Sequence, residues 1–206
     1  MNSLTPYISQ IEEILRRTPG SRRWHIRPVG QVDIYSLSEI ITDSFHSRVG
    51  PMGWFYPFLQ IGITEDLRHR LKSELPHYIC LVAEEVTGNN PIPSLNRHPP
   101  IGTVEMALKP SHFFQRAHKQ HYYLSNLAVQ SKYRRQGVAQ KLLAGCEQIA
   151  LHIGLKDLYL HVLEDNYQAQ RLYHKSGYHL EKVDPDWSSY LLRRPKRLLL
   201  RKHLTS

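Results

Sequence analysis

Residues 134–139 read Arg134-Arg135-Gln136-Gly137-Val138-Ala139 and join an expected strand, 122–129, to an expected helix, 138–153. Backbone N–H groups in the first turn of a helix have no intrahelical partner, and the helix dipole places positive potential there. Gly137 lets a ligand approach the backbone closely, and the two arginines add positive charge. The pattern therefore predicts a binding site for a diphosphate, with a solvated basic helix cap as the competing interpretation.

The composition of the chain is that of one globular domain. Its 206 residues are 41% hydrophobic and 22% charged, which excludes a disordered polyelectrolyte and allows a sizeable core. Lys and Arg number 27 against 18 Asp and Glu, and the resulting net charge of +9 favours an anionic partner. With no long apolar run and no apolar signal core, we expect a soluble intracellular protein that does not span a membrane. Cys80 and Cys146 lack C-x-x-C spacing, which predicts reduced thiols.

Hydrophobic periodicity predicts an N-terminal extension, residues 1–22, with a short amphipathic helix, followed by a single domain, residues 23–206. The elements expected in that domain are strand 24–29, helices 33–45 and 64–75, strands 78–86, 101–108 and 122–129, helix 138–153, strand 158–163, helix 166–176, and strands 178–183, 187–192 and 197–204. A helix between strands 122–129 and 158–163 is a crossover, which makes those two strands parallel. We expect an α/β fold.

A second informative block, Leu160-His161-Val162-Leu163-Glu164-Asp165-Asn166-Tyr167-Gln168-Ala169-Gln170-Arg171-Leu172-Tyr173-His174-Lys175-Ser176-Gly177-Tyr178, follows the expected crossover helix. Together the two blocks resemble the GNAT superfamily of acetyl-CoA-dependent N-acetyltransferases. The family pattern is a strand, R/Q-x-x-G-x-G/A and a helix, then L-x-V-x-x-x-N-x-x-A-x-x-L-Y-x-x-x-G-F/Y. The resemblance is firm over residues 101–178 and extends to Trp24 through the order of elements. It implies a mixed, mostly antiparallel sheet flanked by helices, with two splayed parallel strands at its centre.

The resemblance also implies acetyl-CoA as the cosubstrate. The basic turn would hold its diphosphate, and the edge of strand 122–129 would pair with the pantetheine amides. Asn166 would contact the cofactor arm, and Tyr173, two helical turns further on, would reach the sulfur. The residues implied in binding are Leu127, Ala128, Val129, Arg134, Arg135, Gln136, Gly137, Val138, Ala139, Asn166 and Tyr173.

Four residues are candidates for catalysis. The bacterial ribosomal-protein N-terminal acetyltransferase carries Glu where this chain has His161, whereas NatE-type enzymes combine L-H-V with a tyrosine at the position of Tyr123. The resemblance therefore implies His161 as the base, with Tyr123 holding a relay water, and Tyr173 as the acid for the leaving thiolate. Histidine accepts protons readily because its usual pKa is about 6.5. Glu105 is the rival base, since a carboxylate within an apolar strand needs a cavity or a charge partner. Packed core residues are the alternative reading of His161 and Tyr173.

The acceptor is expected to be a protein or peptide amine, either an N-terminal α-amine or a lysine. The alternatives are a small-molecule amine, or a non-catalytic basic module that binds RNA or the ribosome. Similarity to the cyanobacterial and plastid branch of the family implies a plastid location in a eukaryote, against a cytoplasmic one otherwise.

Three further features of the sequence were considered. His112, His118 and His121 lie in a polar loop without cysteine or acidic neighbours, so we expect solvated histidines and no metal. In the family, the aromatic stretch 54–58 would lie near the acceptor entrance, with ordinary packing as the alternative. The basic stretch 193–197 is expected to be a solvated turn, with an acidic-partner contact as the alternative.

Overall fold

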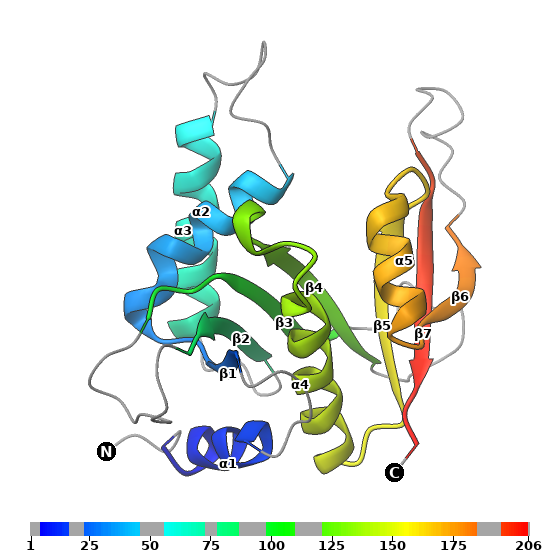
Figure 1. Cartoon of the computed structure of the whole chain (residues 1–206), viewed down its shortest axis with the longest axis horizontal. Helices are drawn as coiled ribbons and strands as arrows, with labels where there is room; N and C mark the ends of the chain where they lie inside the picture. Colours follow the sequence, from blue (N-terminus) through cyan, green and yellow to red (C-terminus); the bar gives the residue numbers. More distant parts are fainter. Residues whose placement is uncertain are drawn as a thin grey trace.

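The computed structural model describes residues 5–16, 23–45, 56–72, 78–86, 98–109, 121–184 and 195–205. A seven-stranded sheet runs through them in the order β1-β2-β3-β4-β5-β7-β6 (Figure 1). The strands are β1 (Trp24–Pro28), β2 (Tyr78–Glu85), β3 (Gly102–Lys109), β4 (His121–Val129), β5 (Asp157–Leu163), β6 (His179–Val183) and β7 (Arg197–His203). The helices are α1 (Thr5–Arg16), η1 (Gln31–Asp33), α2 (Ile34–Phe45), α3 (Tyr56–Lys72), η4 (Ser131–Tyr133), α4 (Val138–His152) and α5 (Tyr167–Lys175).

The sheet is open at its centre, between β4 and β5. This pair is parallel, while the other pairs of the described sheet are antiparallel. Pairing between β4 and β5 is confined to Tyr123 with Tyr159 and Leu124 with Leu160, and Figure 1 shows the two strands running apart beyond that point. The other edge of β4 stays paired with β3 as far as Val129. The expected mixed sheet with splayed central strands is confirmed.

A β-bulge accompanies the divergence. The register of β3 against β4 shifts between Thr103 and Glu105, and Asn126 adopts a left-handed backbone with φ 51°. Asparagine tolerates this region better than most residues, and a bulge bends the strand that carries it. The end of β4 therefore turns away from β5 and leaves the β5-facing edge of residues 127–129 without a strand partner among the described residues.

Two hydrophobic clusters lie on opposite faces of the sheet. Because side chains alternate along a strand, Ile79 and Leu81 of β2 pack in the cluster of α1 and α4, whereas Cys80 and Val82 pack in the cluster of α2 and α3. Both cysteines are buried free thiols, as expected from their spacing. Burial raises the pKa of the Cys80 and Cys146 thiols, which keeps them protonated and unreactive.

The helix α3 begins at Tyr56, and the prediction of a start near residue 64 was wrong. Pro57 lies in the first turn, where proline needs no backbone N–H and its fixed φ suits the helix. Tyr56 is buried while Phe58 is 60% exposed, so within this aromatic stretch the first ring packs in the interior and the second faces solvent. Trp54, Phe55, His112, His118, residues 193 and 194 and the expected strand 187–192 lie outside the described residues.

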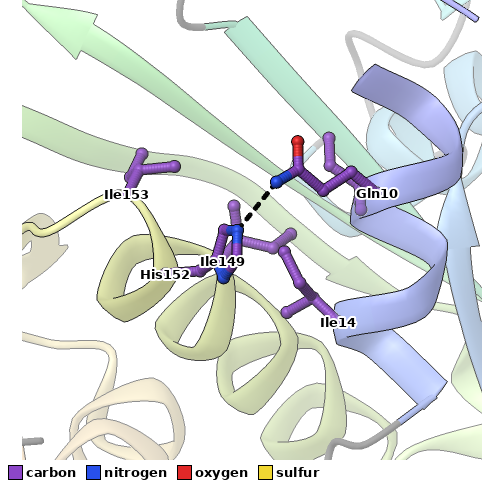
Figure 2. Close-up of a pocket in the computed structure, with 6 residues that line it drawn as sticks. Gln10, Ile14, Ile149, His152 and Ile153 are labelled. Carbon is purple, nitrogen blue, oxygen red and sulfur yellow. Dashed lines mark hydrogen bonds between the residues drawn. The ribbon is translucent and has the colours of Figure 1, made fainter. Parts of the chain in front are cut away.

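The N-terminal helix shares the main core. Ile11 and Leu15 of α1 are buried in the same cluster as α4. A β-carbon added to Gly145 would lie 3.0 Å from Leu15 Cδ2, so glycine at this position allows α1 to pack closely against α4. A pocket of about 230 Å³ lies beside this contact. At the pocket, Gln10 Nε2 lies 2.9 Å from His152 Nε2 (Figure 2). The described apolar side chains of α1 therefore pack into the main core of the domain.

Truncating Leu15 tests whether α1 is part of the core in solution. Leu15→Ala should lower the free energy of unfolding by about 2–4 kcal/mol, because it removes a side chain that is only 5% exposed and leaves a cavity. Chemical denaturation measures the change. Arg16→Ala on the exposed side of the same helix is the control and should change stability by less than about 0.5 kcal/mol. Equal stability of both variants would show that α1 is undocked.

Candidate functional site

The turn between β4 and α4 is shaped by hydrogen bonds to its carbonyl groups. Arg134 Nε donates to the Val129 carbonyl at 3.0 Å, and Trp24 Nε1 donates to the Gln136 carbonyl at 2.9 Å. Arg135 and Gly137 both have positive φ, 63° and 86°. Two left-handed residues reverse the chain tightly, which places the α4 N-terminus directly after the sheet edge.

Unpaired N–H groups gather at this turn. The first backbone bond of α4 runs from Lys141 N–H to the Gly137 carbonyl at 3.0 Å. No acceptor within the described part of the chain receives the backbone N–H groups of residues 135–140. The turn is exposed, and a β-carbon at Gly137 would meet nothing within 4 Å. Backbone donors, the helix dipole and two arginines thus surround open space that fits a diphosphate.

A tyrosine, a histidine and an aspartate form a chain on the other side of the divergence. Tyr123 Oη lies 2.7 Å from His161 Nδ1, and Asp184 Oδ2 lies 2.9 Å from His161 Nε2. Tyr123 belongs to β4, His161 to β5, and Asp184 follows β6 directly. Tyr123 pairs with Tyr159 of β5. His161 lies two residues further along β5, on the same face of the sheet and just beyond the last pair. The expected pair is therefore assembled, and by direct contact between the two side chains.

The Tyr123 phenol keeps its proton at neutral pH. Burial raises its pKa, while the nearby Arg197 guanidinium opposes that rise. A protonated phenol can donate to a neutral imidazole. Arg197 lies at the start of β7 and adds a positive charge to the cluster.

Tyr173 lies on α5, on the other face of the divergence, where it packs against Tyr178 with ring centroids 6.1 Å apart. Burial raises its pKa to about 12, and the proximity of the Tyr123 phenol adds to the rise. The side chain therefore retains its proton at neutral pH. Asn166, expected to contact the cofactor, is the N-cap of α5 and accepts the Ala169 N–H at 3.1 Å.

Glu105, the rival base, lies in a separate cluster. It is 1% exposed, and each oxygen has a partner: Arg70 Nη1 of α3 at 2.7 Å and Asn126 Nδ2 of β4 at 2.8 Å. Asn126 is the residue of the bulge, so Glu105 ties β3, α3 and the bent end of β4 together. A carboxylate engaged in this way serves structure better than proton transfer.

Sequence reasoning missed Asp184, Arg70 and Asn126, and it placed Arg197, the first residue of β7, in a basic solvated turn rather than near Tyr123. The signal for Asp184 was an acidic pair, Asp184 and Asp186, in a basic chain, but nothing local placed it beside His161. His121, one of the three histidines expected in a solvated loop, lies at the start of β4 and packs edge-on against Tyr159. Within the ranges that the structure describes, no helix is long and apolar enough to span a bilayer.

Comparison with known proteins agrees with this arrangement. The acetyltransferase (GNAT) family profile matches residues 36–178. GCN5-related N-acetyltransferase 10, chloroplastic, from Arabidopsis thaliana is 28% identical over 190 residues, covering 88% of this chain and 73% of that protein. GCN5-related N-acetyltransferase 7, chloroplastic, from the same plant is 44% identical over 78 residues, covering 38% of this chain and 28% of that protein.

Solved structures share the fold. Arabidopsis thaliana NAA60 in complex with acetyl-CoA superposes with a TM-score of 0.63 at 18% identity, covering 89% of this chain and 99% of that one. The NatC complex bound to Gag peptide and CoA gives 0.61 at 20% identity, with coverage of 89% and 99%. The family match, together with this fold and its open β4–β5 edge, shows that the chain belongs to the GNAT family of acetyl-CoA-dependent N-acetyltransferases.

Proposed function

We propose that this enzyme acetylates amines of peptides or proteins, at an N-terminal α-amine, a lysine or both. The observation that carries the proposal is the contact between Tyr123 and His161 where β4 and β5 diverge. The NatC structure that shares this fold was solved with a peptide and CoA, and NAA60 was solved with a bisubstrate analogue, which supports a peptide acceptor. The chloroplastic names of the Arabidopsis relatives support a plastid location in a eukaryotic cell.

Acetyl-CoA would lie along the open edge of β4. Its diphosphate meets the N–H groups of residues 135–140 and the arginines at 134 and 135, and its amides pair with the backbone of residues 127–129. Binding there orients the thioester toward the gap between β4 and β5. Fixing both reactants removes much of the entropic barrier to a two-substrate reaction.

The proton transfers need one acceptor and one donor. The attacking amine loses a proton to the pair Tyr123 and His161 as its nitrogen bonds to the acetyl carbon. As the carbon–sulfur bond breaks, Tyr173 donates its proton to the thiolate sulfur, a role for which its pKa of about 12 keeps it protonated. Afterwards the Tyr123–His161 pair releases its extra proton to solvent and Tyr173 regains one from solvent, so both return to their starting protonation states.

Acetylation of a mixed peptide pool tests the acceptor class. Purified enzyme with acetyl-CoA should acetylate α-amines, lysines or both, and mass spectrometry of the products locates each acetyl group. Polyamines and arylalkylamines are assayed in parallel by release of free thiol. Turnover of small amines with an unmodified peptide pool would contradict a peptide acceptor, and binding of RNA without any thiol release would contradict catalysis.

Two glutamine substitutions separate the candidate bases. His161→Gln should lower kcat by about 100-fold or more, the usual contribution of a proton-transfer group, whereas Glu105→Gln should lower it by less than about tenfold. The reason is that Glu105 already bonds Arg70 and Asn126, while His161 contacts the buried Tyr123 phenol. Steady-state kinetics at saturating acetyl-CoA measure both. The reverse ranking would make Glu105 the base.

Charge placed in the basic turn tests the diphosphate site. Gly137→Asp should weaken CoA binding by about tenfold or more, because aspartate tolerates positive φ and its carboxylate repels the diphosphate. Calorimetry measures the dissociation constant. Gly154→Asp, at the other end of α4, is the matched control, since it also has positive φ and open space around its β-carbon. Equal affinities in the two variants would place CoA elsewhere.

A further inference from the structure

The structure places an aspartate, directly after β6, beside His161, a contact that the sequence did not suggest. Asp184 Oδ2 lies 2.9 Å from His161 Nε2, an ion-pair contact whose direction is not that of a hydrogen bond, and the side chains are 20% and 7% exposed. The backbone N–H of Asp184 donates to the Arg197 carbonyl at 2.9 Å, which ties this residue to β7. Both ring nitrogens of the histidine therefore face a polar group, Tyr123 on one side and Asp184 on the other.

From this geometry we propose that Asp184 is a positioning residue: it holds His161 in the Nε2-protonated form, so that Tyr123 takes the amine proton and passes its own to Nδ1. The proposal deepens the proposed function and rests on the Tyr123–His161 pair as its proton acceptor.

The tautomer follows from what each neighbour can do. An ionised carboxylate stabilises a nearby N–H and cannot donate, so its charge favours the neutral tautomer whose proton is on the nitrogen facing Asp184. Nδ1 is then an acceptor, and the Tyr123 hydroxyl is its donor. Burial of the phenol raises its pKa, which keeps that hydroxyl protonated before reaction.

The relay is balanced in protons and bonds. The amine N–H bond breaks as a proton moves to Tyr123 Oη, and the phenol O–H bond breaks as its proton moves to His161 Nδ1. The phenol is regenerated and the ring becomes an imidazolium, whose positive charge faces the Asp184 carboxylate. The arrangement has the logic of the serine–histidine–aspartate triad, in which the aspartate orients the ring and stabilises its charged form.

The charges around the ring come from three elements besides its own strand. Tyr123 faces it from β4, Asp184 from the end of β6, and Arg197 lies near the phenol from the start of β7. Within the described part of the chain, removing the carboxylate leaves the Arg197 guanidinium as the charge that acts on the Tyr123 phenol. The imidazolium then forms less readily, because an anion favours the charged form of a histidine and a cation disfavours it.

The pH dependence of kcat/KM in Asp184→Asn tests the role. The relay requires neutral His161, so activity is lost as pH falls through the pKa of this ring. Loss of the carboxylate should lower that pKa, and the acidic limb should move to lower pH by about one unit. The plateau rate should fall by about tenfold or more because the ring is less well oriented. Asp184→Glu should restore part of both.

A second histidine–aspartate pair provides the control. Asp157 Oδ1 lies 3.0 Å from His203 Nδ1 at the other end of β5, where the pair is more exposed. Asp157→Asn should leave the profile unchanged. A lower rate in Asp184→Asn with an unmoved acidic limb would mean a merely structural role and would overturn the proposal, as would a wild-type profile.

Nuclear magnetic resonance reports the tautomer in the unaltered protein, and a variant is needed only to assign the signals. In protein labelled with ¹⁵N-histidine, the signals absent from His161→Gln identify the ring. Above the acidic limb, Nε2 should be protonated and Nδ1 unprotonated. A proton on Nδ1 at that pH would refute the relay. This measurement needs no acceptor amine, so its result can be interpreted even if no peptide is acetylated. The kinetic test can be carried out with any amine that the enzyme acetylates.

Discussion

The early end of pairing between β4 and β5 is the constraint on which the rest of this structure depends. Backbone groups that leave a ladder must find other partners; after Leu124 the edge of β4 facing β5 has no strand partner among the described residues, and its Val129 carbonyl accepts from Arg134 Nε. The strand edge is therefore available to an extended ligand. The same divergence brings Tyr123 and His161 together at the last paired residues. The edge proposed for the cofactor and the pair proposed as proton acceptor thus arise from one irregularity in the sheet.

Keeping the strands apart requires a fixed bend, and a buried charge helps to hold it. A carboxylate removed from water is costly unless it is hydrogen-bonded and paired. Glu105 meets both conditions, through Arg70 of α3 and Asn126 of the bulge. One side chain therefore links β3, helix α3 on one face of the sheet and the bent end of β4. The carboxylate that the sequence offered as a base has a structural explanation in these contacts.

The sequence predicted most elements to within one or two residues where the local signals were strong. The crossover helix and α5 begin and end within one residue of the expected bounds, and Gly154 and Gly177 after them adopt positive φ, as is common at helix ends. The start of α3 was missed because Pro57 was taken as part of a loop, although proline is favourable in a first helical turn. Docking of α1 beside Gly145 could not be foreseen, since its partner lies far along the chain.

The sequence by itself determined the basic turn with its glycine, the helix that follows it and the family pattern, because these signals lie within a few residues of one another. Tertiary structure alone decided that Tyr123 bonds His161 directly, that Asp184 faces the same ring and that Glu105 is paired. Such contacts join residues on different strands and helices. They depend on strand order, register and a bulge, which are set by the packing of the whole sheet and leave no local trace in the sequence.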